Sequence, residues 1–424
     1  MKRPVTAWAL YDWANSAFAT VVMAGFFPIF LRDYWAAGSD SQSVTFYLGL
    51  ANSLSSLMIM LVAPYLGAVA DQGSLKKRFL VQFAFLGILM TAGLFWLAQG
   101  QWQLAVAFYA LASFGFMGAN VFYDSLLVDV AEPRRYERAS AFGFALGYLG
   151  GGLLFAVCVW MTLKPQVFGL ADEAQAVRFS FLLTAAWWAI FSIPLVLFVR
   201  ESRRAAPEGT ARVARAGFRQ LWRTFRDIRQ LRPVMLFLAA YWLYIDGVDT
   251  VIRMAVDYGR AIGFDTGGLI TALLVTQFVG FPAAILYGRL GERIGARRGI
   301  YIGLGVYVLI TLWAARMESV WEFYALATVI GLVQGGIQAL SRAFYARLIP
   351  AGKSAEFFGF YNVLGKFAAV IGPVMVGWVG LLADSPRVGI LSLLMLFAGG
   401  ALLLYFVPER SVGTSASGES GGRD

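Results

Sequence analysis

Residues 67–78 read Gly-Ala-Val-Ala-Asp-Gln-Gly-Ser-Leu-Lys-Lys-Arg and stand between two long apolar runs. The same spacing of a glycine, an acid and a basic pair returns at residues 288–298, 221 positions later. A second motif, Phe-Gly-Phe, stands at 142–144 and again at 358–360, 216 positions apart. The agreement of the two offsets indicates that the chain consists of two similar halves.

The composition indicates a membrane protein. Of the 424 residues, 59% are hydrophobic and 14% are charged, whereas soluble globular proteins are about 45–50% apolar and about 25% charged. So few charges cannot cover a water-soluble surface. A bilayer-crossing helix needs about 20 mostly apolar residues. Twelve runs of this kind are predicted, at 8–31, 46–70, 79–98, 102–130, 139–163, 178–199, 233–258, 266–290, 299–315, 321–346, 355–382 and 387–407.

The distribution of Lys and Arg predicts the orientation. The two termini and the loops on their side of the membrane carry 27 of these residues, and the opposite side carries 6. Positive charge accumulates on the cytoplasmic side, so we expect both termini in the cytoplasm. The first apolar run is too long for a signal peptide and is expected to be a span. Since topology explains the net charge of +10, nucleic-acid binding is not expected.

The predicted architecture is all-α, with twelve transmembrane helices in two pseudo-symmetric six-helix bundles. We expect bundles at 1–199 and 233–407, a basic cytoplasmic linker at 200–232 and a disordered tail at 408–424. Repeated six-helix halves are typical of transporters. An amphipathic helix on the inner leaflet is predicted within the linker, with a solvated linker as the alternative. Its apolar residues are Phe218, Leu221, Trp222, Phe225 and Ile228.

Three motifs carry a resemblance to a known family. They are Tyr-Asp-Trp-Ala-Asn-Ser-Ala at 11–17, Gln-Ala-Leu-Ser-Arg at 338–342 and Phe-Phe-Gly-Phe-Tyr-Asn at 357–362. The whole chain resembles the major facilitator superfamily, and these motifs resemble the autophagy-related vacuolar amino-acid effluxers and their bacterial relatives. The resemblance implies a permease with the major facilitator fold. The expected location is a bacterial cytoplasmic membrane, and the alternative is a vacuolar membrane, as in the fungal relatives.

We interpret nine of the charged residues in the predicted spans as intramembrane charges. A charge at the bilayer centre costs about 2.5–3.5 kcal/mol on insertion scales, so such residues mark cavities or ion pairs. The resemblance implies that the third, sixth, ninth and twelfth helices are peripheral. None of the nine charges lies on these four helices. The nine are Asp12, Asp124, Asp129, Asp246, Asp249, Arg253, Asp257, Arg342 and Lys366.

The seventh predicted helix carries a single polar face, because four of these charges recur there at helical spacing. A carboxylate removed from water can take up and release a proton near neutral pH, and opposite charges around one cavity suit a zwitterion. The alternative is a set of structural ion pairs. The expected substrate and coupling residues are Asp12, Asn15, Asp246, Asp249, Arg253, Asp257, Gln334, Gln338 and Lys366.

A second group of charges lies near the inner ends of the helices. We expect it to hold an inner gate shut by pairing with neighbouring helix ends. The alternative is anchoring of the basic loops without a gating role. The expected gate residues are Asp71, Lys76, Lys77, Arg78, Asp124, Asp129, Arg138, Glu292 and Arg342.

The sequence argues against an enzyme. It contains no histidine and a single cysteine, Cys158, which removes the usual general base and the usual zinc ligands. Neither a cofactor nor a metal is expected. A gradient of protons or of another ion is the expected driving force. The predicted function is secondary transport of a small polar solute, with an amino acid and proton coupling favoured, by a monomer in the bilayer. The alternatives are an uncoupled facilitator, an exporter of another small molecule and a non-transporting receptor or scaffold.

Overall fold

The computed structural model describes residues 2–38, 41–202, 210–226, 231–261, 266–367 and 371–408, and all regular secondary structure in these ranges is helical. The predicted disordered tail lies outside the described residues except for Pro408, and so does Ile228 of the linker. The helices before the linker are α1 (Arg3–Ala17), η1 (Phe18–Phe26), α2 (Phe27–Phe30), η2 (Leu31–Trp35), α3 (Ser41–Gly73), α4 (Lys76–Gly93), η3 (Leu94–Trp96), α5 (Trp102–Ser125), α6 (Leu127–Val130), η4 (Pro133–Arg135), α7 (Tyr136–Leu163), η5 (Pro165–Phe168) and α8 (Glu173–Phe198).

The linker forms α9 (Thr210–Arg226). The helices after it are α10 (Arg232–Ala261), α11 (Thr266–Ile294), α12 (Ala296–Ala314), α13 (Val320–Leu348), α14 (Ser354–Phe367), α15 (Ile371–Leu382), α16 (Pro386–Leu391) and α17 (Leu393–Tyr405).

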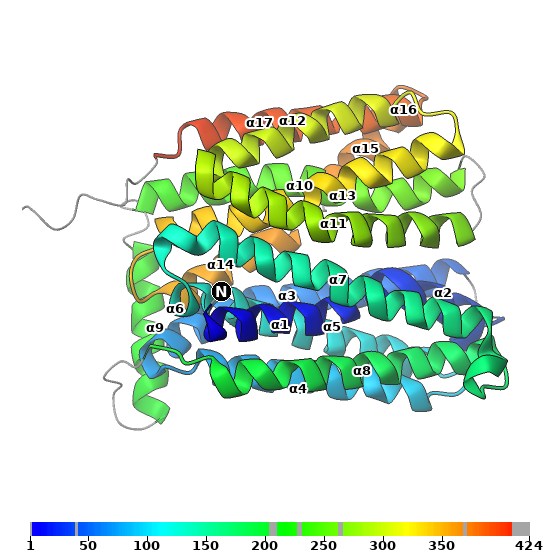
Figure 1. The fold of residues 1–424 in the computed structure, drawn as a ribbon, viewed down its shortest axis with the longest axis horizontal. Helices are drawn as coiled ribbons and strands as arrows, with labels where there is room; N and C mark the ends of the chain where they lie inside the picture. Colours follow the sequence, from blue (N-terminus) through cyan, green and yellow to red (C-terminus); the bar gives the residue numbers. More distant parts are fainter. Residues whose placement is uncertain are drawn as a thin grey trace, which may run out of the picture.

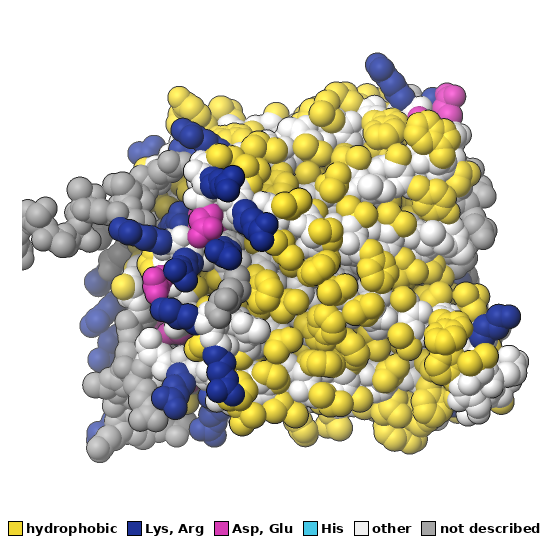
Figure 2. All heavy atoms as spheres, in the orientation of Figure 1, with side chains coloured by type: hydrophobic (Ala, Val, Ile, Leu, Met, Phe, Trp, Pro, Cys, Tyr) yellow, Lys and Arg dark blue, Asp and Glu magenta, His cyan; other side chains and the backbone are white. Residues whose placement is uncertain are grey.

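Ten segments of the described chain are long and apolar enough to cross a bilayer. The predicted spans 299–315 and 355–382 correspond to α12 and to α14 with α15, and they are not among the ten. A broad hydrophobic belt covers the visible face, and Lys and Arg gather at one end of it (Figure 2). The chain is therefore a multi-pass membrane protein.

The helices run side by side, with α1 to α8 in the lower part of Figure 1 and most of α10 to α17 in the upper part. Within the first group, α4 packs on α5 and α1 packs on α7 and α8. Within the second, α11 packs on α13 and α10 packs on α17. The two groups meet through α7 with α11 and through α3 with α14. Residues far apart in the sequence therefore face each other between the groups.

The linker helix α9 crosses the basic end of the molecule instead of running along it (Figure 1). It packs against the end of α3. The predicted position of this helix on a membrane surface stays a prediction.

The contact between α3 and α14 depends on a glycine. A Cβ added at Gly67 would collide with the backbone of Ala355 and Glu356, at the start of α14. Since backbone atoms cannot move aside as a side chain can, only glycine allows this approach.

We predict that Gly67→Val separates α3 from α14 and destabilises the protein by about 1–3 kcal/mol, the usual cost of overpacking. The thermal unfolding midpoint in detergent measures the effect. Gly49→Val is the matched control, because Gly49 lies on the same helix with open space around its Cβ position. Equal midpoints for the two variants would contradict the assigned contact.

Candidate functional site

A cavity of about 400 Å³ lies between the two groups of helices. Residues of α1, α5 and α7 line one side of it, and residues of α10, α13 and α14 line the other. Its charged and amide side chains are Asp12, Asn15, Asn120, Asp124, Asp249, Gln338, Arg342 and Asn362.

Arg342 of α13 is the cation of this cavity and is buried. One guanidinium nitrogen lies 2.8 Å from a carboxylate oxygen of Asp124, and another lies 3.8 Å from one of Asp12. The guanidinium also donates to the hydroxyl and carbonyl oxygens of Ser140, at 2.8 and 2.9 Å. Arg342 thus connects the second group of helices to α1, α5 and α7 of the first.

The α1 side of the cavity is held by hydrogen bonds. Asp12 is buried and accepts from the Tyr123 hydroxyl at 3.0 Å. Asn15, one turn further on, donates to the side-chain oxygen of Asn120 at 2.6 Å. On the other side, Asn362 of α14 donates to Asp124 at 2.9 Å. Asp12, Asn15 and Asn362 are therefore each positioned by a partner on another helix.

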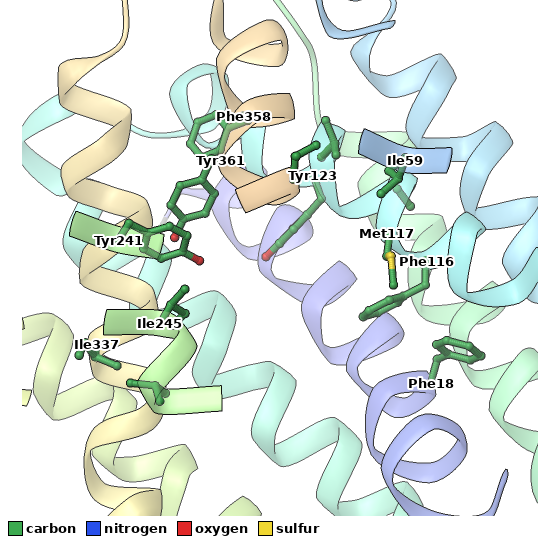
Figure 3. Close-up of a cluster of buried hydrophobic side chains, with 14 of the residues drawn as sticks. Phe18, Ile59, Phe116, Met117, Tyr123, Tyr241, Ile245, Ile337, Phe358 and Tyr361 are labelled. Carbon is green, nitrogen blue, oxygen red and sulfur yellow. The ribbon is translucent and has the colours of Figure 1, made fainter. Parts of the chain in front are cut away.

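Aromatic rings form a further part of the wall. Tyr241 and Tyr361 stack with ring centroids 4.3 Å apart. Figure 3 shows this pair from the second group of helices on one side, and Tyr123 and Phe116 from the first group on the other. The Arg342 guanidinium lies 4.4 Å from the ring centroid of Phe144, within cation–π range.

The two acids of α10 have different surroundings, although the sequence predicts one polar face. Asp249 lines the central cavity. Asp246 is buried and accepts from the backbone N–H groups of Ile371 and Gly372 at 3.1 and 3.0 Å. These are the first described residues of α15, so Asp246 fixes α15 against α10 through two backbone amides.

The other predicted binding residues fall into three cases. Gln338 lines the central cavity, whereas Gln334 lines a separate, mainly apolar cavity of about 160 Å³. Arg253, Asp257 and Lys366 lie in helices, but their side chains fall outside the described part of the structure. The alternative of structural ion pairs among these charges therefore stays a prediction.

At the basic end, Asp71 and Lys76 contact the start of α14. Asp71 accepts from the backbone N–H groups of Ala355 and Glu356 at 3.1 and 2.9 Å. The Lys76 ammonium donates to the Ser354 hydroxyl at 2.7 Å. These are contacts of the kind that the gate hypothesis requires.

Neighbouring residues extend this cluster. Lys76 also pairs with Asp129 at 2.8 Å, and Asp129 accepts from the Ser202 N–H. Lys77 donates to the carbonyl oxygens of Val196 and Val199 at the end of α8. The Glu201 carboxylate accepts from the Lys76 N–H at 2.9 Å, and burial raises the pKa of this carboxyl.

The remaining predicted gate residues are exposed: Arg78, Arg138 and Glu292. At the α7–α13 corner an ion pair that the sequence analysis missed joins Arg347 to Glu137 at 2.6 Å. Arg347 also donates to the carbonyl oxygen of Pro133. Both residues lie at helix ends beside loops rich in Lys and Arg. The sequence therefore does not single out one acid and one base there as a pair.

The sequence analysis also missed Asn120, Tyr123, Ser140 and Asn362 as cavity and partner residues. Helical spacing offers a signal for two of them, since Asn120 stands four residues before Asp124 and Asn362 four before Lys366. Ser140 and Tyr123 are recognisable only from the helix packing.

Comparison of the chain with known proteins identifies its family. The family model described as "Vacuole effluxer Atg22 like" matches residues 37–135 and 128–416. The chain belongs to this family. It is also 39% identical to the MFS-type transporter YxiO of Bacillus subtilis (strain 168) over 407 residues, which are 96% of this chain and 95% of that protein.

Further likenesses agree with this assignment. Autophagy-related protein 22 of Coccidioides immitis (strain RS) is 24% identical, with 96% of this chain and 87% of that protein covered. The human organic anion transporter MFSD10 matches with a TM-score of 0.70 at 16% identity, covering 95% of this chain and 99% of that one. The proton:xylose symporter XylE matches with a TM-score of 0.67 at 13% identity, covering 96% and 94%. This member of the Atg22-like family is a major facilitator transporter.

We predict that Arg342→Gln destabilises the protein by about 3–5 kcal/mol, because Asp124 then remains buried without its cation. The double variant Asp124→Asn with Arg342→Gln regains part of that loss. Thermal unfolding midpoints of the single and double variants measure the coupling. Arg298→Gln, which removes an exposed arginine of α12, is expected to stay within about 0.5 kcal/mol of the parent. Additive losses would show that the pair is not coupled.

Proposed function

We propose that this protein is a secondary active transporter that carries a small zwitterionic solute, an amino acid in the first instance, by alternating access. The observation that carries the proposal is the central cavity, which places three carboxylates and one guanidinium between the two groups of helices. Its volume of about 400 Å³ lies within the range of small-molecule sites.

The charges of the cavity support a zwitterion. Arg342 provides a bidentate donor for a carboxylate. Asp12, Asp124 and Asp249 provide acceptors for an ammonium group. The aromatic wall of Tyr241 and Tyr361 suits an apolar side chain or a cation–π contact. Since Arg342 already contacts Asp124 and Asp12, an incoming carboxylate competes with these acids for the guanidinium.

Proton coupling is assigned to the cavity carboxylates. Asp249 faces the cavity and is the favoured carrier, with Asp12 second. Asp246 is less suited, because its carboxylate accepts from two amides of α15. Its proposed role is to position α15 against α10.

The proposed architecture is twelve transmembrane helices in two six-helix bundles, at 1–199 and 233–407. Both termini and α9 are placed in the cytoplasm of a bacterial inner membrane, which matches the basic end in Figure 2. The contacts of Asp71 and Lys76 with α14 then close the cytoplasmic side. The protein is proposed to act as a monomer without a cofactor or catalytic activity.

Two other functions lead to different measurements. An uncoupled facilitator carries solute without a response to a pH gradient. A receptor or scaffold on the same fold carries no solute at all. The description of the family, a vacuole effluxer, supports transport over a receptor or scaffold.

We predict that counterflow in proteoliposomes loaded with a mixed amino-acid pool responds to a pH gradient. Asp249→Asn is expected to abolish this response while exchange continues, because an amide cannot bind and release the proton. Asp246→Asn is expected to lower transport with and without the gradient, because its NH₂ group faces backbone N–H groups.

The two variants control for each other, since each replaces one acid of the same helix by its amide. A gradient response that persists in Asp249→Asn would exclude this residue as the proton carrier. Absence of exchange with every amino acid would exclude the proposed cargo, and sugars, organic ions and drugs would be tested next.

A further inference from the structure

The linker helix α9 has a protein-facing side made of small and polar residues. Gly217 packs against Val69 of α3, and Gln220 and Thr224 are buried. Gln220 donates to the Glu356 carboxylate of α14 at 2.5 Å and is hydrogen-bonded to Gln72 of α3. Lys353, just before α14, donates to the Thr224 hydroxyl at 2.9 Å. One face of α9 thus joins α3 to α14.

The opposite side of α9 is exposed and amphipathic. Phe218 and Trp222 are 61% and 66% exposed, which is unusual for aromatic rings unless they meet lipid or a partner. Arg215 and Arg219 are exposed one turn apart beside these rings. Neither guanidinium pairs with an acid in the part of the chain that the structure describes.

These four side chains and Tyr65 of α3 line one open groove of about 460 Å³. Tyr65 stands eight residues before the end of α3. At 1.5 Å per residue, the groove extends about 12 Å from that end toward the apolar belt. Three of its lining residues are aromatic and the other two carry a positive charge. This combination matches a molecule with an anionic head and an apolar tail.

We propose that this groove binds the headgroup of an anionic phospholipid of the leaflet on which α9 lies. Arg215 and Arg219 contact the phosphate, and Phe218, Trp222 and Tyr65 contact the glycerol and the upper acyl chains. Charge complementarity and the position of α9 at the basic end argue for a lipid over a soluble protein partner. The proposal needs the membrane placement of the chain and is independent of cargo and coupling.

Bound lipid also has a consequence for the fold. Since the other face of α9 contacts α3 and α14, a lipid that holds α9 in place stabilises the contact between the two groups of helices. A ligand that binds only the folded state raises the unfolding midpoint. Anionic lipid is therefore expected to stabilise this end of the molecule.

The test compares the full-length protein in nanodiscs of phosphatidylcholine with increasing phosphatidylglycerol, followed by native mass spectrometry of retained lipid. The parent is expected to retain one phosphatidylglycerol in preference to phosphatidylcholine. Arg215→Gln with Arg219→Gln is expected to bind it about 10- to 30-fold more weakly, from about 1 kcal/mol for each basic residue near the surface. Trp222→Ala is expected to weaken retention without removing the preference for the anionic headgroup.

The matched control is Arg289→Gln with Arg293→Gln. It removes a second exposed pair of arginines at the same spacing on α11 and leaves the groove intact. Equal weakening by both double variants, or equal retention of the two lipids by the parent, would overturn the proposal. Displacement of phosphatidylglycerol by millimolar glycerol phosphate would do so too, because it would identify a site for free phosphate.

Thermal unfolding gives an independent measurement. Phosphatidylglycerol is expected to raise the midpoint of the parent and of the α11 control, and to leave the midpoint of the α9 double variant unchanged. Both replaced arginines of α9 are exposed, so this variant is expected to fold. A rise of equal size in all three proteins would contradict binding in the groove.

Discussion

The ion pair of Arg342 with Asp124 is the interaction on which the centre of the molecule depends. A guanidinium buried between helices is tolerated only when acids and hydrogen-bond acceptors surround it. Asp124, Asp12 and Ser140 provide them from three helices of the first group, at 2.8, 3.8 and 2.8 Å. The charge therefore ties together helices that are remote in sequence. The same requirement keeps the cavity polar, since an apolar wall would leave the cation unpaired. A solute that binds here has to replace some of these contacts, and this exchange links binding to the packing of the two groups.

Two further acids of the spans act on backbone groups. Asp71 accepts from amides in the first turn of α14, and Asp246 accepts from the amides of Ile371 and Gly372 in α15. The amides at a helix start lack partners within the helix, and the helix dipole favours a negative charge there. In a membrane protein such amides need a partner more than they do in water. A carboxylate on a neighbouring helix satisfies two amides at once. These contacts hold the segment α14–α15 against α3 at one end and against α10 near the middle.

Much of the architecture was predictable because the bilayer imposes long apolar helices and a charge asymmetry on the sequence. The family resemblance was predictable from the motifs at 11–17, 338–342 and 357–362, and it is confirmed. Cavity residues were partly predictable, since Asp12, Asn15, Asp249 and Gln338 stood out as polar groups in apolar helices. The positions of Asp246 against α15 and of Gln334 in a separate cavity were not predictable from the sequence. Helical periodicity gives the face on which a residue lies, but it does not say which helix packs against that face.

Local chemistry thus determined the helical spans, the basic end, the amphipathic nature of α9 and the presence of buried charge. Each of these follows from hydropathy or charge along short stretches of chain. Only the tertiary structure decided that Arg342 pairs with Asp124, that Asp246 binds two amides of α15, and that α9 joins α3 to α14 while exposing an aromatic groove. These contacts join residues that are more than one hundred positions apart. They depend on the relative placement of whole helices, which no local pattern of residues specifies.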